Sequence, residues 1–263
     1  MSISIRPKKR LGQNFLVSEK LAERISKAAG ISGKDTVLEV GPGTGKLTLR
    51  LAEKAKRVVA IEKDPRMVEI LKKSFKNNKK VEILEKDILK VDPSCLKLKE
   101  YKLAGNIPFY LTSPLIRKFL EEKNPPEQMT LVVQKEVAQR ICSRPPEMNL
   151  LAVSVQAYSE ASILFYIPRS SFWPKPKVDA AVLKIIPRKK KLISASFRDP
   201  FFKVVKAGFS QPRKQLLNNF SKMLKLSKGK TAEWLLKNNV DPERRAETLE
   251  IEEWIELTKT FKG

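Results

Sequence analysis

The sequence predicts an α/β fold, in which a mostly parallel, doubly wound sheet is followed by a small all-helical domain. Short β-branched segments alternate with amphipathic ones through the first part of the 263-residue chain, as strands do when helices connect them. After the basic run at 187–191 only amphipathic segments remain. This change of pattern predicts two domains, at 1–187 and 188–263.

A basic arm over 1–16 leads into the first expected helix, 18–29. Ser18 is a suitable N-cap because its hydroxyl can accept a hydrogen bond from a free amide of the first turn. Apolar residues at helical spacing predict the buried face of this helix. They are Leu21, Ile25 and Ala28.

The region of alternating strands and helices follows. Its expected strands are short and apolar, at 36–40, 57–61, 81–84, 102–104 and 129–133. Its expected helices lie at 46–54, from Asp64 and Pro65 onward, and at 113–121. Asp64 suits an N-cap. Pro65 suits the first turn, because the amide that a proline lacks would have no hydrogen-bond partner within the helix at that position.

Two later segments, 150–167 and 178–186, are apolar and β-branched, so we expect antiparallel strands that finish the edge of the sheet. Beyond the basic run, helices are expected from Asp199 and Pro200 onward, over 231–238 and over 249–261. No clear strand pattern occurs in this last region, which is why we assign it to a separate helical domain.

The chain is strongly basic, with 53 Lys and Arg residues against 29 Asp and Glu and a net charge of +24. Such an excess indicates a polyanionic partner, nucleic acid first and an anionic membrane second, because bound phosphates release counterions. No apolar run approaches the roughly 18 residues that span a bilayer, and residues 1–11 lack the apolar stretch of a secretory signal. We therefore expect a cytoplasmic protein.

The sequence contains no histidine and only two cysteines, Cys95 and Cys142, which are far apart. Ser-His and Cys-His nucleophile pairs and histidine-containing metal sites are therefore excluded, and neither a disulfide framework nor a zinc cluster is expected. The chemistry must run without imidazole, thiolate or metal. Methyl transfer to an amine fits this limit, because the reactive sulfonium belongs to the cofactor.

A glycine-rich loop, 41–45, lies between the first expected strand and its helix and has the form G-x-G-x-G. The spacing differs from the G-x-G-x-x-G of dinucleotide sites, and Pro42 removes an amide that a pyrophosphate site could use. The loop suits S-adenosylmethionine, a cofactor without phosphate. The alternative interpretation is an ordinary strand-to-helix turn.

Acidic residues follow the next two expected strands. Glu62 can accept both ribose hydroxyls of a nucleoside, and Asp87 can accept from the cofactor's adenine amino group. Each of them also fits a solvated charge at a strand end. With the glycine loop they share the carboxyl edge of the sheet, where doubly wound folds bind their ligands.

The segment Asn106-Ile107-Pro108-Phe109 follows the fourth expected strand at the same edge. The Asn106 amide oxygen and the Pro108 carbonyl can accept from an exocyclic amine, and Phe109 can stack on a planar base. Alone, this segment also fits an ordinary turn after a strand. Together with the glycine loop and the two acids, it predicts a site for the N6 amine of adenine.

These motifs and two others closely resemble the rRNA adenine dimethyltransferase family, which includes the KsgA-type and Erm enzymes. The segments that carry the resemblance are 12–16 (GQNFL), 39–45 (EVGPGTG), Glu62, Asp87, 106–109 (NIPF) and 172–178 (FWPKPKV). They cover nearly the whole chain, and 211–216 and 244–247 resemble the KsgA branch more than the Erm branch. Two departures are Phe109, where many relatives carry Tyr, and Pro212, in a segment usually written with two arginines.

The resemblance implies a Rossmann-like, S-adenosylmethionine-dependent methyltransferase sheet. It also implies N6,N6-dimethylation of two adjacent adenines in a hairpin loop near the 3′ end of small-subunit rRNA, during ribosome biogenesis. The implied cofactor contacts are Asn14, Leu16, Gly41, Glu62, Asp87 and Asn106. The implied catalytic residues are Asn106 and Pro108, which would hold the adenine amine, and Phe109 and Phe172, which would clamp the ring.

Basic residues around this site are candidates for binding rRNA phosphates, although each one alone could also be an ordinary charged residue on a solvent-exposed face. They are Arg6, Lys8, Lys9, Arg10, the 188–191 run, Lys203, Lys206, Arg213 and Lys214. We expect a monomer that acts on rRNA in the small ribosomal subunit, with no metal and no membrane.

Three alternatives stay open at this point. One is an Erm-type enzyme acting on large-subunit rRNA, which the C-terminal motifs disfavour. Another is a non-catalytic nucleic-acid-binding relative of the mitochondrial transcription factor type, which the intact glycine loop and Asn-x-Pro-aromatic segment disfavour. The third is an NAD-dependent oxidoreductase, which the spacing of the glycine loop and the net charge disfavour.

Overall fold

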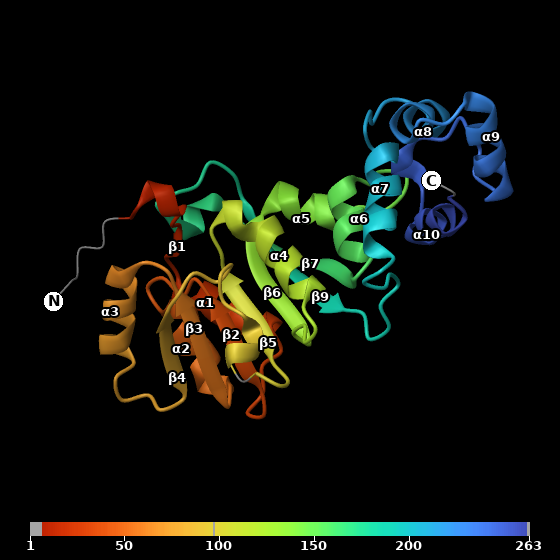
Figure 1. Ribbon diagram of the computed structural model, residues 1–263. Helices are drawn as coiled ribbons and strands as arrows, with labels where there is room; N and C mark the ends of the chain where they lie inside the picture. The colour runs from red at the N-terminus through yellow and green to blue at the C-terminus, as the bar shows by residue number, and fades with distance from the viewer. Residues whose placement is uncertain (1–6, 97, 262–263) are drawn as a thin grey trace. The chain divides into compact units, whose positions relative to one another are not determined.

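The computed structural model describes residues 7–96 and 98–261 (Figure 1). The chain divides into two compact units. The first comprises the chain through Ala138 together with Ala161–Pro187, and the second comprises Gln139–Glu160 together with the chain from Arg188 onward. Segment 139–160 groups with the C-terminal unit, where the Met148 amide donates to the Glu247 carbonyl at 2.9 Å. The functions assigned to domains 1–187 and 188–263 stay a prediction.

The central sheet has seven strands in the order β4-β3-β2-β5-β6-β9-β7. They are β2 (Thr36–Val40), β3 (Arg57–Glu62), β4 (Val81–Glu85), β5 (Lys102–Asn106), β6 (Gln128–Gln134), β7 (Ser159–Ile167) and β9 (Ala180–Pro187). Strands β2 to β6 pair in parallel, and β9 pairs antiparallel with β6. Because β2 lies between β3 and β5, the strand order reverses there, which opens a crevice at the carboxyl ends of these strands.

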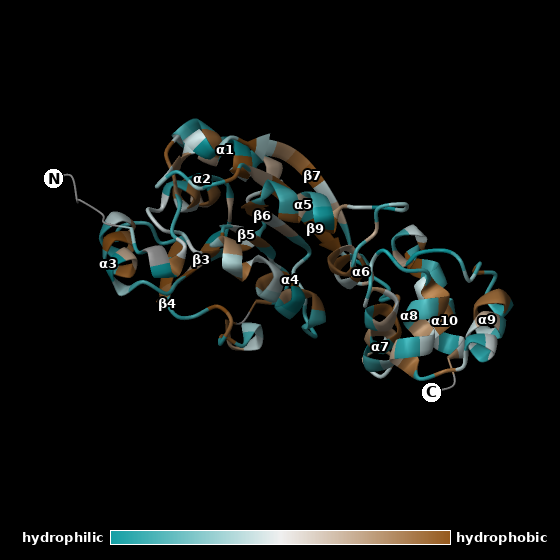
Figure 2. Cartoon of the chain, turned by 90° about the horizontal axis from the view of Figure 1, so that it is seen from above, coloured by the Kyte–Doolittle hydropathy of each residue, from teal (hydrophilic) through white to brown (hydrophobic). Residues whose placement is uncertain are grey.

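Helices connect the strands and cover the sheet (Figure 2). They are α1 (Glu19–Ala28), α2 (Lys46–Lys54), α3 (Pro65–Ser74), α4 (Thr112–Glu121) and α5 (Lys135–Ile141). A buried cluster that includes Ile25, Leu51 and Val37 packs α1 and α2 against the strands, and Figure 2 shows α4 on the opposite side of the sheet. This architecture confirms the predicted α/β class.

Two helix starts follow from local capping. The Ser18 hydroxyl accepts from the Leu21 amide at the start of α1, and the Asp64 carboxylate accepts from the Arg66 amide at the start of α3. The expected inner face of α1 was partly wrong. Its buried residues are Ala22, Ile25 and Ser26, with Ala29 just beyond the last turn, whereas Leu21 and Ala28 are half-buried. The buried Ser26 hydroxyl donates to the Arg50 carbonyl on α2 at 3.0 Å, and Leu21 packs against the same hydrophobic cluster as Ile25.

The expectation of strand throughout 150–167 was wrong for its first half, where α6 (Leu150–Gln156) forms. Asn149 caps this helix, since its side-chain oxygen accepts from the amides of Leu151 and Ala152, each at 3.1 Å. The N-cap adds to a favourable composition, since only Val153 and Val155 within this helix are β-branched. The remainder forms β7, which neighbours β9 at the edge of the sheet.

The chain beyond Arg188 is helical in its described part, apart from an isolated bridge between Gln215 and Arg245. The helices are α7 (Arg198–Gly208), α8 (Leu216–Leu224), α9 (Lys228–Lys237) and α10 (Ile251–Thr260). They enclose an aromatic core in which Phe209 and Trp254 stack with ring centroids 5.3 Å apart. The predicted helical C-terminal region is confirmed, and α8 is an addition to it. Among the described residues, none of the helices is long and apolar enough to cross a membrane.

Candidate active site

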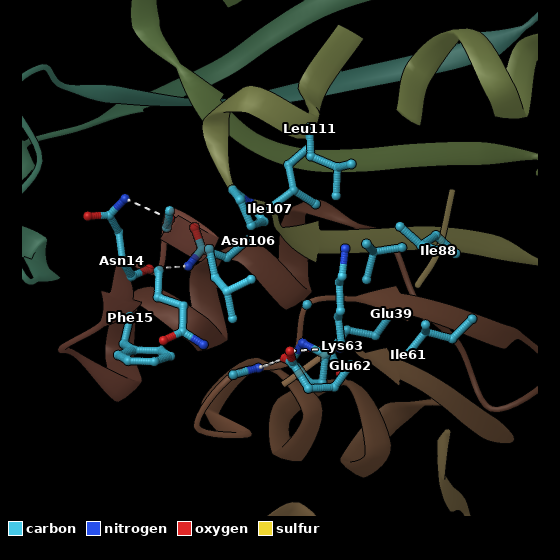
Figure 3. Close-up of a pocket in the computed structure, with 18 of the residues that line it drawn as sticks. Asn14, Phe15, Glu39, Ile61, Glu62, Lys63, Ile88, Asn106, Ile107 and Leu111 are labelled. Carbon is cyan, nitrogen blue, oxygen red and sulfur yellow. Dashed lines mark hydrogen bonds between the residues drawn. The ribbon is translucent and has the colours of Figure 1, made fainter. Parts of the chain in front are cut away.

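A pocket opens at the carboxyl ends of β2, β3 and β5, where the sequence predicted a binding site (Figure 3). Its walls come from the segment 11–16, the glycine loop, the segments after β3 and β4, and the segment that follows β5. The predicted cofactor contacts all line it, namely Asn14, Leu16, Gly41, Glu62, Asp87 and Asn106. The fold therefore brings these residues together, while their binding function stays a prediction.

The glycine loop turns sharply because its glycines adopt positive φ values that other residues rarely take, 66° at Gly41, 55° at Gly43 and 82° at Gly45. A Cβ atom on Gly43 would lie 2.9 Å from the ring of Phe15. The ring therefore packs directly on the loop backbone and closes one side of the pocket. Phe15 itself lies in the short strand β1 (Phe15–Leu16), which pairs antiparallel with β8 (Phe172–Trp173).

Glu62 ends β3 and is held in one orientation by backbone amides. Its Oε2 accepts from the Gly43 amide at 3.2 Å, and its Oε1 accepts from the amides of Lys63 and Asp64, both at 2.9 Å. Burial raises the pKa of Glu62, although the three amides act in the opposite direction. A carboxylate has about four acceptor positions, so Glu62 keeps capacity for hydroxyl donors at the pocket wall.

Asp87 follows β4 and accepts from two donors. Its Oδ2 accepts from the Lys63 ammonium at 2.8 Å, and its Oδ1 accepts from the Leu89 amide at 3.1 Å. The hydrogen bond from Lys63 lowers the pKa of Asp87 most, with smaller contributions from the Leu89 amide and nearby lysine charges. The carboxylate thus stays ionised at neutral pH and can accept from an amino group.

Asn106 is the last residue of β5, and its amide is fixed by the N-terminal segment. Its Nδ2 donates to the Asn14 carbonyl at 2.7 Å, as Figure 3 shows. The side chain of Asn14 in turn donates to the Gly12 carbonyl at 3.2 Å. Because the nitrogen of the Asn106 amide is engaged by backbone, its Oδ1 is the atom left to accept from a ligand.

Pro108 and Phe109 lie just beyond. The Pro108 carbonyl accepts from the Leu111 amide at 2.9 Å and starts a 3-10 turn, Phe109–Leu111. A carbonyl has two lone pairs, so one remains for a ligand. Phe109 is half-buried against the hydrophobic cluster under α1 and α2 and lies outside the lining of the pocket.

Phe172 is 3% exposed and belongs to the same hydrophobic cluster as Leu16, its partner across the β1–β8 pair. The structure thus gives Phe172 a packing contact with the segment that carries two predicted cofactor residues. Its predicted contact with the adenine ring, like that of Phe109, stays a prediction.

Glu39, for which no function was predicted, lines the pocket and is 1% exposed. Neither of its carboxylate oxygens has a hydrogen-bond partner among the described residues. Burial raises the pKa of Glu39 to about 8, while the nearby Thr48 hydroxyl lowers it and the charge of Glu62 adds a smaller increase. The signal available in the sequence is an acidic residue inside an otherwise apolar strand.

A second unexpected feature is Asp64, which joins the N-terminal segment to α3. Its side chain is fully buried and accepts from Lys8 at 3.3 Å, from Gln13 at 3.0 Å and from Arg66 at 2.6 Å. These hydrogen bonds, that of Arg66 first, lower the pKa of Asp64 far below its ordinary value. Lys8, predicted to grip RNA, is therefore paired with Asp64 in this structure.

The other predicted phosphate contacts are mostly solvent-exposed. Arg10, Lys206, Arg213 and Lys214 are exposed, and so is Lys203, whose ammonium lies 5.2 Å from the Phe261 ring. Arg6 and the side chain of Lys9 lie outside the described part of the chain. Within residues 7–96 and 98–261, no group of three or more Cys, Asp or Glu side chains could hold a metal ion.

Solved structures with this fold show the class of protein. A dimethyladenosine transferase from Plasmodium falciparum is 27% identical, with a TM-score of 0.77 over 92% of this chain and 95% of its own. The 23S rRNA methyltransferase ErmE is 26% identical, with a TM-score of 0.76 over 94% of this chain and 99% of its own. The fold and the pocket therefore define a methyltransferase.

The sequence narrows this class to a family. The model of the ribosomal RNA adenine dimethylase family matches residues 5–262. Ribosomal RNA small subunit methyltransferase A of Dehalococcoides mccartyi is 39% identical over 262 residues, which are 99% of this chain and 90% of that protein. The chain belongs to the ribosomal RNA adenine dimethylase family, which confirms the predicted resemblance and the predicted class of enzyme.

Proposed function

We propose that this enzyme uses S-adenosylmethionine to dimethylate the N6 amines of two adjacent adenines in a hairpin loop near the 3′ end of small-subunit rRNA. The orientation of the Asn106 amide carries the proposal. Its nitrogen is bound by the Asn14 carbonyl at 2.7 Å, so its oxygen is directed to accept from an amine. The name of the Dehalococcoides relative, similar over nearly the full length of both chains, supports the small subunit as the source of the substrate.

The residues of the pocket fit S-adenosylmethionine, because the glycine loop lines the pocket and a Cβ on Gly41 would meet no atom closer than 3.7 Å, which leaves the backbone there accessible to a ligand. Glu62 would accept the ribose hydroxyls, Asp87 the adenine amine, and Gly41, Asn14 and Leu16 would line the remaining surface. When bound, the cofactor supplies an electrophilic methyl group on a sulfonium. No pyrophosphate needs to be held, which agrees with the proline inside the glycine loop.

The chain's own contribution is to hold and orient the target amine. The N6 lone pair of adenine is conjugated into the ring, which makes it a poor nucleophile. Hydrogen bonds from N6–H to Asn106 Oδ1 and to the Pro108 carbonyl favour a tetrahedral nitrogen and free that lone pair. Catalysis then rests on position and electrostatics, and the proton leaves to water because the chain contains no histidine to take it.

The target adenine must be unpaired or turned out of its stack to reach this amide, at a cost of a few kcal/mol. Phe109 would stack on the ring and compensate part of that cost. The exposed lysines and arginines of the second unit would bind phosphates and position the RNA without reading its sequence. The rim must also admit an N6 amine that already carries one methyl group, since the product is dimethylated.

The proposal is tested by incubating the protein with labelled S-adenosylmethionine and unmethylated small or large ribosomal subunits, followed by mapping of the modified bases. We expect label at two adjacent adenines of small-subunit rRNA. Label confined to large-subunit RNA would instead show the substrate of the 23S rRNA methyltransferase ErmE and would overturn the proposed substrate.

The mechanism is tested with N106A, which removes the acceptor. We expect a loss of about a hundredfold or more in kcat, as when one preorganised polar group is removed from other active sites. N77A is the matched control, because Asn77 is exposed in the turn between α3 and β4. Full activity in N106A would contradict the proposed mechanism even if the substrate were correct.

A further inference from the structure

Trp173 is exposed at the rim of the active site, although tryptophan is a large apolar residue. It is 52% exposed, whereas its neighbour Phe172 is 3% exposed. The two alternate along β8, so that Phe172 faces the hydrophobic cluster and Trp173 faces solvent. Its exposed ring is a flat apolar surface that a nucleic-acid base can stack on.

The position of Trp173 ties it to the pocket. It pairs with Phe15 across the β1–β8 pair, and the two rings stack with centroids 6.4 Å apart and an angle of 26° between their planes. Phe15 lines the pocket and packs on Gly43. The indole is thus fixed at the edge of the active site by a ring that is itself 7% exposed.

The segment that follows Trp173 is basic. Lys175 and Lys177 are both exposed, and neither forms an ion pair within the described part of the chain. Arg169 holds this segment in place by donating to the Lys177 carbonyl at 3.2 Å. An exposed aromatic ring beside unpaired cations is the combination that binds single-stranded nucleic acid, through base stacking and phosphate contacts.

We propose that Trp173 is a stacking platform for the nucleotide next to the target adenine, with Lys175 and Lys177 holding its phosphates. The inference rests on the proposed function, because a neighbour of the target exists only if the target lies in unpaired RNA. With two adjacent adenines, one base occupies the site while the other stacks on the indole. Trp173 thereby contributes to the choice of an unpaired, purine-containing loop as substrate.

The kinetic test compares wild type with W173A, W173F and Y166A on unmethylated small subunits. Stacking that is equal in the ground and transition states changes KM and leaves kcat unchanged. Because one face of the base stays in water, we expect W173A to raise KM about five- to tenfold. This increase corresponds to the lower end of the free energies measured for stacking of a base on an aromatic side chain. W173F should restore most of this affinity. Y166A is the matched control, since Tyr166 is 48% exposed and lies on β7.

A second measurement needs no variant and no methyl transfer. The chain has three tryptophans, of which Trp254 is fully buried and Trp234 is half-buried. Hairpin RNA with two adjacent loop adenines should therefore quench mainly the fluorescence of Trp173. Replacing one of these adenines with an abasic nucleotide should remove most of the quenching, and W173F should show little quenching by either RNA.

The outcomes separate this inference from the proposed function. Equal KM values for wild type and W173A, or equal quenching by intact and abasic RNA, would overturn the platform. A W173A variant whose affinity for S-adenosylmethionine falls while its RNA affinity is unchanged would also overturn it, because Trp173 would then act only by supporting Phe15. Quenching without methylation of small subunits would leave the platform in place and refute the proposed substrate.

Discussion

The buried carboxyl of Glu39 makes the stability of the protein depend on pH, and E39Q isolates this dependence. The pKa of Glu39 is raised from 4.5 to about 8 by burial, so the folded protein holds a proton that the unfolded chain has lost. The stability linked to this group is complete below pH 4.5, falls as pH rises, and becomes level above about pH 8. Each pH unit in between costs about 1.4 kcal/mol, and the total is about 5 kcal/mol.

Glutamine has the shape of the neutral acid and cannot ionise. At pH 5 we expect E39Q to be less stable than wild type by about 1–3 kcal/mol, because its amide hydrogens add buried donors. Toward pH 9 the order should reverse, with the variant more stable by a few kcal/mol. Chemical denaturation across this range measures the difference, and E100Q is the control, since Glu100 is exposed. Parallel stability curves for E39Q and wild type would refute the reasoning, because the other titrating groups, including Glu62, whose pKa burial also raises, are present in both proteins.

Four further variants test other contacts. D64N keeps an N-cap but weakens the hydrogen bonds from Lys8 and Gln13. Residues 8–16 should therefore be cleaved faster in limited proteolysis, and the affinity for the cofactor should fall about tenfold. An unchanged cleavage rate would contradict this expectation. G208A places a Cβ 2.4 Å from the Trp254 ring and should lower the free energy of unfolding by about 1–3 kcal/mol. In G229A the added Cβ meets no atom within 4 Å, so this variant should raise the free energy of unfolding by up to about 1 kcal/mol. Thermal unfolding measures both changes. G105A places a Cβ 2.5 Å from the Val40 carbonyl, which should separate β5 from β2. We expect this variant to lose cofactor binding, as measured by calorimetry. Retained binding would show that the two strands can adjust to the added methyl group.

The strands and the edge of the sheet that binds ligands could be predicted because their signals are local. The alternation of short apolar segments with helical ones placed β2 to β6, and parallel strands necessarily bring Gly41, Glu62 and Asn106 to one edge. By contrast, the composition of 150–167 as a whole does not separate the helix Leu150–Gln156 from the strand after it, although Asn149 caps this helix and only Val153 and Val155 within it are β-branched. Composition averages over a segment, whereas a cap acts at one residue.

The parts that could not be predicted depend on contacts between distant segments. The residues near Asp64 in the sequence do not indicate that Lys8 and Gln13 will both donate to its carboxylate. The same is true of segment 139–160, which groups with the helical unit through contacts such as that between Met148 and Glu247. The aromatic residues of 172–178 were recognisable as a motif, but their division into a buried Phe172 and an exposed Trp173 needed the β1–β8 pairing.

The pairing of β1 with β8 also bears on how the enzyme is made. One wall of the pocket consists of Phe15 and Leu16, yet their strand partner, Phe172–Trp173, lies far beyond them in the sequence. A nascent chain that ends before this partner has the glycine loop, Glu62 and Asn106 but cannot close the wall beside them. Closure of this wall therefore waits until the chain has been made through Trp173, long after the glycine loop and Asn106.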